Sequence, residues 1–201
     1  DLVVNDENKY AGFEFFGLDP NKKTILMVGG SLGARTLNDS IIESFESIKK
    51  SGVQVIWQCG KYYYNEMLAL EEKGSIPENI LLLDFVSRMD YAYSVADLII
   101  SRAGAGSISE FCNLSMPVIL VPSPNVSEDH QTQNALALVE HDAAIMVKDS
   151  EAKSTLFDTA ISLINDSKRL EGLSANISKL AQHNSANRIV DEIEKLINAN
   201  K

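Results

Sequence analysis

Three loops in this sequence place residues that could bind phosphate or sugar hydroxyls directly after short apolar runs. The first is GGSLGA at residues 29–34, which contains Gly30, Ser31 and Gly33. Glycines let a ligand approach the backbone closely. The amides at the start of a following helix, together with a serine hydroxyl, suit an anionic oxygen. The loop is no Walker P-loop, because the Lys-Ser/Thr pair is missing. A tight strand-to-helix turn without a ligand is the alternative.

The second loop is SRAGAGSISE at residues 101–110, with Gly104, Ala105 and Gly106 ahead of an acid, Glu110. The glycines open a predicted helix, and the Glu110 carboxylate about one turn into it could accept hydrogen bonds from both hydroxyls of a ribose. A solvated acid in a first helical turn is the alternative interpretation. The segment only approximates a dinucleotide fingerprint, because Ser109 stands at the third glycine position and the acid comes too early.

The third loop is PSPNVSEDHQTQNALAL at residues 122–138. It places several hydrogen-bond donors and acceptors within five residues, among them the side chains of His130, Gln131 and Asn134. Amide-rich clusters of this kind suit sugar hydroxyls, which need paired donors and acceptors. Ordinary capping of a helix by Asp129 or Thr132 is the alternative. His130 could act as a general base, but spacing fixes no carboxylate partner for it.

Short apolar runs that alternate with helical segments must position these loops. The runs are continuously apolar, which is typical of strands buried on both faces of a parallel sheet. The pattern predicts an α/β, Rossmann-like doubly wound sheet with loops that bind ligands at the carboxyl ends of the strands. The six predicted strands are residues 24–30, 53–59, 80–85, 97–101, 118–122 and 143–147.

The helical segments complete a single predicted domain over residues 24–201, preceded by a lead-in or linker at residues 1–23. Residues 34–50 place apolar side chains at helical spacing on one face. The C-terminal part of the chain consists of helical segments only, at residues 150–166, 167–182 and 185–197.

Composition narrows the function classes. The net charge of −10 over 201 residues leaves no basic stripe for nucleic acid and gives no attraction to an anionic membrane. The two cysteines, Cys59 and Cys112, have no metal-ligand spacing and indicate a reducing compartment. No Asp-x-Asp pair or metal cluster is evident, so we expect neither a metal nor a cofactor.

Together, the segments ILMVGGSLGA, FVSRMDYAYSVADLIISRAGAGSISEF, MPVILVPSP and DHQTQNAL resemble the C-terminal half of the MurG-type transferases of peptidoglycan synthesis. The resemblance covers about residues 18–147, and the terminal helices also fit. It implies one half of a GT-B glycosyltransferase. That family moves N-acetylglucosamine from UDP-GlcNAc to lipid-linked MurNAc-pentapeptide, which converts lipid I to lipid II with inversion at the anomeric carbon.

The resemblance also implies roles for individual residues. Ser31, between Gly30 and Gly33, would contact phosphate. The backbone of Val86 would read the uracil edge. Ala105 and Gly106 would face the diphosphate and ribose, and Glu110 would accept the ribose diol. His130 and Gln131 would contact sugar hydroxyls, in a register shifted by a one-residue insertion, and Asn134 would order that loop.

The same resemblance implies that an N-terminal, acceptor-binding half is absent from this sequence, together with the general base. We therefore expect no catalytic residue here, and a chain that binds donor without transferring sugar. The intact enzyme would lie on the cytoplasmic face of the plasma membrane. Two alternatives are a UDP-GlcNAc 2-epimerase of the same fold, whose catalytic acids and bases are not found, and an NAD-binding oxidoreductase domain. The latter would need a glycine fingerprint on the first strand and an acid at the end of the second, which here ends in WQCG at residues 57–60.

Overall fold

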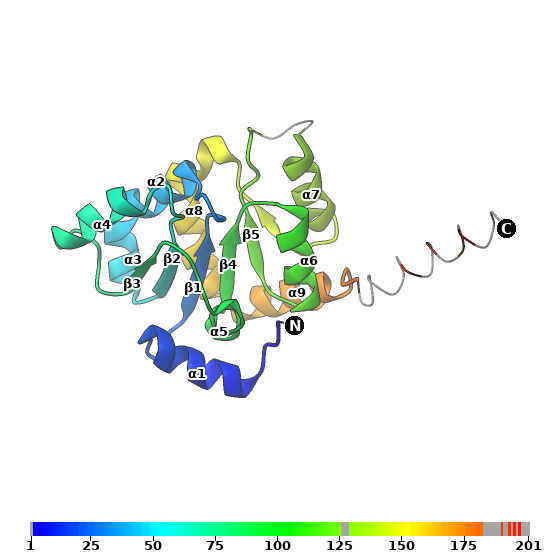
Figure 1. The fold of residues 1–201 in the computed structure, drawn as a ribbon, viewed down its shortest axis with the longest axis horizontal. Helices are drawn as coiled ribbons and strands as arrows, with labels where there is room; N and C mark the ends of the chain where they lie inside the picture. Colours follow the sequence, from blue (N-terminus) through cyan, green and yellow to red (C-terminus); the bar gives the residue numbers. More distant parts are fainter. Residues whose placement is uncertain are drawn as a thin grey trace.

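Six parallel strands form one sheet in the order β3-β2-β1-β4-β5-β6, which confirms the predicted α/β architecture (Figure 1). The computed structural model describes residues 2–125 and 129–182, with single positions at 190, 193, 195 and 197. Every residue of β2 and β4 is buried, as expected for strands covered on both faces. The strands are β1 Thr24–Val28, β2 Gln54–Gln58, β3 Ile80–Leu83, β4 Leu98–Ser101, β5 Val118–Leu120 and β6 Ile145–Met146.

The strand order reverses next to β1. From β1 the chain moves outward to β2 and β3, then returns to place β4 on the other side of β1. Val28 and Ser101, the last residues of β1 and β4, are paired in register. The loops that follow these two strands therefore start level with each other at the switch point, where open α/β sheets bind ligands.

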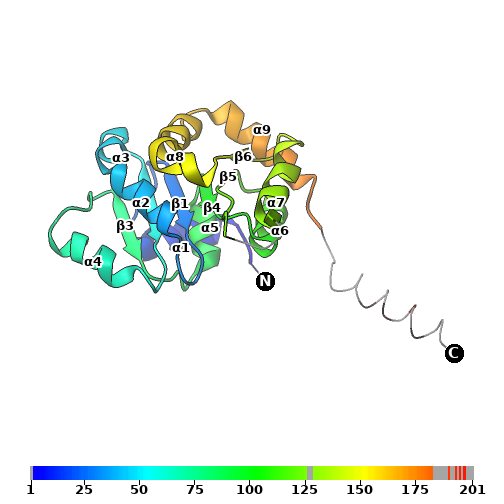
Figure 2. The ribbon, with the colours of Figure 1, turned by 90° about the horizontal axis from the view of Figure 1, so that it is seen from above.

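Helices cover both faces of the sheet. One core contains side chains from α2, α3, α4 and α8, and the other contains side chains from α5, α6 and α7. Figure 2 shows α8 and α5 on opposite sides of β1. These helices are α2 Arg35–Glu43, α3 Phe45–Ser51, α4 Tyr64–Glu72, α5 Met89–Val95, α6 Ala105–Asn113, α7 His130–Val139 and α8 Asp149–Ile164, and α9 spans Ser167–Ser178.

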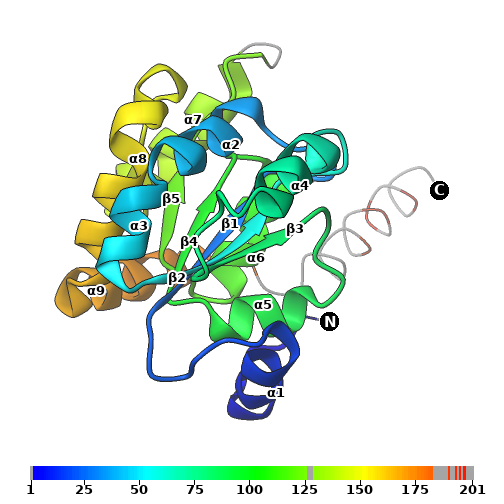
Figure 3. The same cartoon turned by 90° about the vertical axis from the view of Figure 1, so that its left-hand side faces the viewer.

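The lead-in at residues 1–23 contains a helix that the sequence did not reveal, α1 Asp6–Phe16. The Asn5 side chain caps it by accepting the Asn8 amide at 2.8 Å, and Gly17 ends it at φ 65°. Phe15 lies edge-on to Tyr91 of α5 at a centroid separation of 5.8 Å, a geometry typical of aromatic pairs. Figure 3 shows α1 alongside α5 at the foot of the molecule.

The C-terminal and second helical segments differ in detail from the sequence-based prediction. Residues 34–50 form two helices rather than one, because the Ser44 amide bonds back to Ile41 at 3.0 Å and Ser44 leaves the helical conformation. Helices α8 and α9 match their predicted segments. The third expected helix, at residues 185–197, lies outside the described part of the chain except for four single positions. None of the described helices combines the length and the apolar character that crossing a bilayer requires.

Two glycines bring the loops after β1 and β2 into direct contact. A Cβ on Gly33 would lie 2.2 Å from the Cys59 carbonyl oxygen, and one on Gly60 would lie 2.2 Å from the Gly33 backbone. Both residues have positive φ, 90° and 86°. Buried Asn38 adds to this junction, since it donates to the Cys59 carbonyl at 3.0 Å and accepts from the Trp57 indole at 2.9 Å.

We predict that Gly33→Ala lowers the free energy of unfolding by at least about 2 kcal/mol, because strain at positive φ and a backbone clash coincide. Gly74→Ala is the control: Gly74 has φ 67°, but a Cβ there would meet no atom within 4 Å. It should cost about 1 kcal/mol, from backbone strain alone. Urea unfolding followed by the fluorescence of the single tryptophan, Trp57, measures both. Equal losses would contradict the role of the close contact.

Candidate functional site

The loop after β1 is held in shape by a buried glutamine on β2. The Gln58 side chain accepts the Gly29 amide at 3.0 Å and donates to the carbonyls of Gly30 and Asp84, each at 2.9 Å. Gln58 is 3% exposed. One side chain thus fixes the loop that carries Ser31 relative to the loop after β3. Gly30 and Ser31 are exposed, so both face solvent at the carboxyl edge.

The loop after β4 leads into α6 with open space in front of it. Gly104 is the N-cap residue and supplies no side-chain cap, and α6 starts at Ala105. The first amides of any α-helix lack partners within the helix. A Cβ on Gly104 or Gly106 would meet no protein atom within 4 Å. The helix start is therefore unobstructed by protein and carries the positive end of the α6 dipole.

Side chains from α7 fasten this loop. Gln131 Oε1 accepts the amides of Ala103 and Ser123, at 3.2 and 2.9 Å. Asn134 Nδ2 donates to the Ala103 carbonyl at 3.1 Å. The side-chain carbonyl oxygen of Gln131 is thus already engaged, which leaves its Nε2 group as the atom able to contact a ligand. His130 is the first residue of α7 and is exposed.

Glu110 projects from the other side of α6, toward α5. Its Oε2 accepts a hydrogen bond of 2.8 Å from the hydroxyl of Tyr93. Tyr93 is buried, and burial, with the neighbouring Glu110 carboxylate, raises the pKa of its phenol well above the ordinary range. The hydroxyl is therefore a permanent donor at physiological pH. Glu110 itself is exposed at the surface.

Val86 lies between β3 and α5 and is buried, while its neighbour Phe85 is 52% exposed. The ammonium group of Lys61 lies 5.6 Å from the centre of the Phe85 ring. The Lys61 amide also donates to the Ser31 carbonyl at 3.3 Å. The loops after β1, β2 and β3 consequently form one continuous rim, and Lys61 places a positive charge on it.

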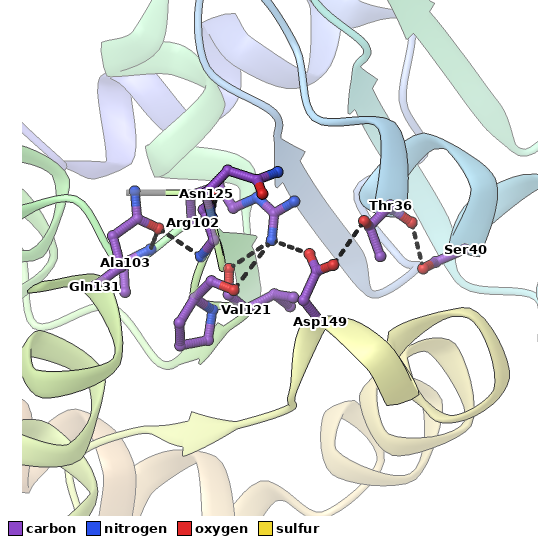
Figure 4. A network of polar contacts seen from close by, with 10 residues as sticks. Thr36, Ser40, Arg102, Ala103, Val121, Asn125, Gln131 and Asp149 are labelled. Carbon is purple, nitrogen blue, oxygen red and sulfur yellow. Dashed lines mark hydrogen bonds and ion pairs between the residues drawn. The ribbon is translucent and has the colours of Figure 1, made fainter. Parts of the chain in front are cut away.

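A polar network joins the ends of β4 and β5 to the first turns of α2 and α8 (Figure 4). Arg102, directly after β4, bonds to the Asp149 carboxylate and donates to the Val121 carbonyl at 3.0 Å. The second Asp149 oxygen accepts from the Thr36 hydroxyl at 2.9 Å. Asp149 starts α8 and Thr36 lies in the first turn of α2. The network thus ties the ends of β4 and β5 to two helices.

The cysteines offer no nucleophile at this edge. Burial raises the pKa of the Cys59 thiol to about 11 and also raises the pKa of Cys112. Both thiols therefore stay protonated at neutral pH. Within the part of the chain that the structure describes, no group of three or more His, Cys, Asp or Glu side chains is arranged to hold a metal ion.

The sequence-predicted residues outside the first turn of α6 fall into three groups around it. Glu110 lies on the flank of α6 nearest α5, which follows Val86. Gln131 and Asn134 lie on the α7 flank, and a groove of about 350 Å³ between α6 and α7 is lined by Ala105 and Asn134 among others. Ser31 and its glycines stand across the switch point. All the loops predicted from sequence thus meet at one edge of the sheet.

Sequence reasoning missed the three side chains that hold these loops: Gln58, Tyr93 and Arg102. Gln58 had a signal, because it is a polar residue within an otherwise apolar strand. Arg102 also had one, since it stands inside the glycine loop at residues 101–110. Tyr93 had none, because its partner Glu110 lies on a different helix and only folding brings them together.

These features define an α/β domain of the kind that binds nucleotides at a topological switch point. Residues 24–193 match the sequence model of the glycosyltransferase family 28 C-terminal domain, and the chain belongs to this family.

Comparison with known proteins gives the same family. The chain is 57% identical over 198 residues to the UDP-N-acetylglucosamine--N-acetylmuramyl-(pentapeptide) pyrophosphoryl-undecaprenol N-acetylglucosamine transferase of Parabacteroides distasonis, covering 98% of this chain and 53% of that protein. The chain thus spans about half the length of the curated relatives it matches. The crystal structure of Acinetobacter baumannii MurG is 32% identical with a TM-score of 0.73, covering 93% of this chain and 53% of that one.

A third comparison shows the fold alone. The crystallised C-terminal domain of a glycosyl transferase group 1 family protein from Francisella tularensis is 17% identical, with a TM-score of 0.63. The match covers 89% of this chain and 93% of that one, so a domain of similar extent forms this architecture there.

We predict that Asp149→Asn lowers the free energy of unfolding by about 1–3 kcal/mol, because it leaves the largely buried Arg102 guanidinium without its counter-charge. The control is Glu66→Gln, which removes the partner of Arg35 in an ion pair whose side chains are 50% and 55% exposed. That change should cost no more than about 0.5 kcal/mol. Urea denaturation at neutral pH compares the two. A loss for Asp149→Asn no larger than for the control would contradict the stabilising role of the network.

Proposed function

We propose that this chain binds UDP-N-acetylglucosamine and supplies the donor site of an inverting N-acetylglucosaminyltransferase of peptidoglycan synthesis. The observation that carries the proposal is the arrangement at the switch point. Two glycine loops flank it, one containing Ser31 and Gly33 and one opening α6, and Glu110 lies about one turn beyond. Membership of the family 28 C-terminal domains supports the same assignment.

The geometry supports a distinct task for each loop. The amides at Ala105 and Gly106 and the Ser31 hydroxyl suit the diphosphate oxygens, because they are hydrogen-bond donors at or near a helix start. They would have to supply the attraction locally, because the chain's overall charge of −10 offers no general attraction to an anion. In this proposal the backbone of Val86 would read the uracil edge, and Glu110 would accept hydrogen bonds from the ribose hydroxyls.

In this proposal the sugar is bound by residues of α7. His130 and the Nε2 group of Gln131 would contact its hydroxyls. Asn134, through its bond to the Ala103 carbonyl, would hold the loop in place rather than touch the sugar.

The reaction of the intact protein is part of the same proposal. The relatives' names specify transfer of N-acetylglucosamine to a lipid-linked N-acetylmuramyl-pentapeptide, and those proteins are about twice as long as this chain. The domain would stabilise the departing UDP with preorganised amides and the α6 dipole. The acceptor site and general base would come from the remaining half, at the cytoplasmic face of the membrane.

We predict that this chain binds UDP weakly, binds NAD less well, and transfers no sugar by itself. Titration calorimetry with UDP and with NAD measures the first two properties, and a transfer assay with UDP-GlcNAc measures the third. Absence of both heat and chemical-shift changes at millimolar UDP would exclude the proposed site. Preference for NAD would favour the oxidoreductase alternative.

Glu110→Ala should weaken UDP binding about tenfold or more, because hydrogen bonds to a charged acceptor are lost. Binding of free uracil should hardly change. The matched control is Glu171→Ala, since this exposed acid lines a groove with Lys23 and Asp97 at the opposite, amino edge of the sheet. Equal losses for UDP and uracil in the Glu110 variant would refute the ribose role.

A further inference from the structure

Tyr93 stands in a position that fixes the side chain of Glu110. It lies on α5 and is 3% exposed, and its ring packs edge-on against Phe111 at 6.2 Å between centroids. Phe111 is itself 1% exposed. The ring is thus locked between α5 and α6, and its hydroxyl reaches out of the core to Glu110 Oε2 at 2.8 Å.

This contact makes the two oxygens of the Glu110 carboxylate inequivalent. Oε2 accepts from Tyr93, while the described residues provide no hydrogen-bond partner for Oε1. An exposed glutamate ordinarily samples many rotamers, and binding has to restrict them at a cost in free energy. A buried donor that holds one oxygen removes most of that freedom before the ligand arrives.

The contact also links two parts of the proposed site. Helix α5 begins three residues after Val86, whose backbone is the proposed uracil contact. Helix α6 carries Glu110 and opens with the amides proposed for the diphosphate. The Tyr93–Glu110 hydrogen bond therefore joins the helix that follows the proposed base-reading segment to the helix that carries the proposed ribose acceptor.

We propose that Tyr93 is a positioning residue for ribose recognition: its hydroxyl holds Glu110 Oε2, so that Oε1 is presented to the ribose hydroxyls. The inference rests on the proposed function and deepens it. The ligand class it selects is a ribonucleoside diphosphate, because an analogue without ribose hydroxyls gains nothing from an oriented carboxylate. Tyr93 itself touches no ligand.

The test compares UDP with dideoxy-UDP, which lacks both ribose hydroxyls, by titration calorimetry. Tyr93→Phe keeps the packed ring and removes only the hydroxyl. It should weaken UDP binding about three- to tenfold, the range expected for losing one oriented hydrogen bond. Binding of dideoxy-UDP should stay unchanged. Tyr91→Phe is the matched control, since it removes a hydroxyl from the same helix beside Arg88 and Phe15 and should alter neither affinity.

A double-mutant cycle separates positioning from general structural support. On a Glu110→Ala background, Tyr93→Phe should have no further effect on UDP affinity, because the group that Tyr93 orients is gone. If the Tyr93→Phe effect persists there, or if UDP and dideoxy-UDP lose affinity equally, the positioning role is overturned.

The outcomes also distinguish this inference from the proposed function. Wild-type protein that fails to bind UDP would overturn both. Wild-type binding that Glu110→Ala weakens and Tyr93→Phe leaves intact would overturn the positioning role alone. Circular dichroism melting curves establish that each variant is folded in the titrations.

Discussion

The reversal of strand order beside β1 is the constraint on which the arrangement of this domain depends. Because β2 and β4 flank β1 on opposite sides, the chain leaves the ends of β1 and β4 in opposite directions. The space between those departing loops cannot be filled by a crossover helix. The glycine loop around Ser31 and the start of α6 face this space, and the helices on both faces of the sheet follow from the same topology.

Polar side chains, rather than the backbone alone, hold the loops around that space. Gln58 connects the loops after β1 and β3, Arg102 connects β4 and β5 to α2 and α8, and Gln131 connects α7 to the loop after β4. Each of these side chains is at least partly buried, so its hydrogen bonds compete little with water. The loops at this edge of the sheet are thereby preorganised, which would reduce the ordering that a ligand bound there has to impose.

The site needs few cationic side chains, although the protein is acidic. Arg102 is neutralised by Asp149, and Lys61 stands on the rim near Phe85. Oriented amides and a helix dipole act over short distances and do not raise the net charge. The proposed diphosphate contacts would therefore depend on the geometry of the backbone amides, while the chain as a whole carries a net charge of −10.

The sequence by itself determined the strands, the single parallel sheet and the loops that carry the candidate residues, because buried parallel strands are continuously apolar and glycines mark their ends. It did not determine α1, whose apolar residues gather toward its C-terminal end, nor the break at Ser44. Only the tertiary structure decided that Tyr93 holds Glu110 and that Gln131 uses its side-chain carbonyl oxygen to accept backbone amides. Such contacts join residues far apart in the chain, and their geometry exists only after the helices pack on the sheet.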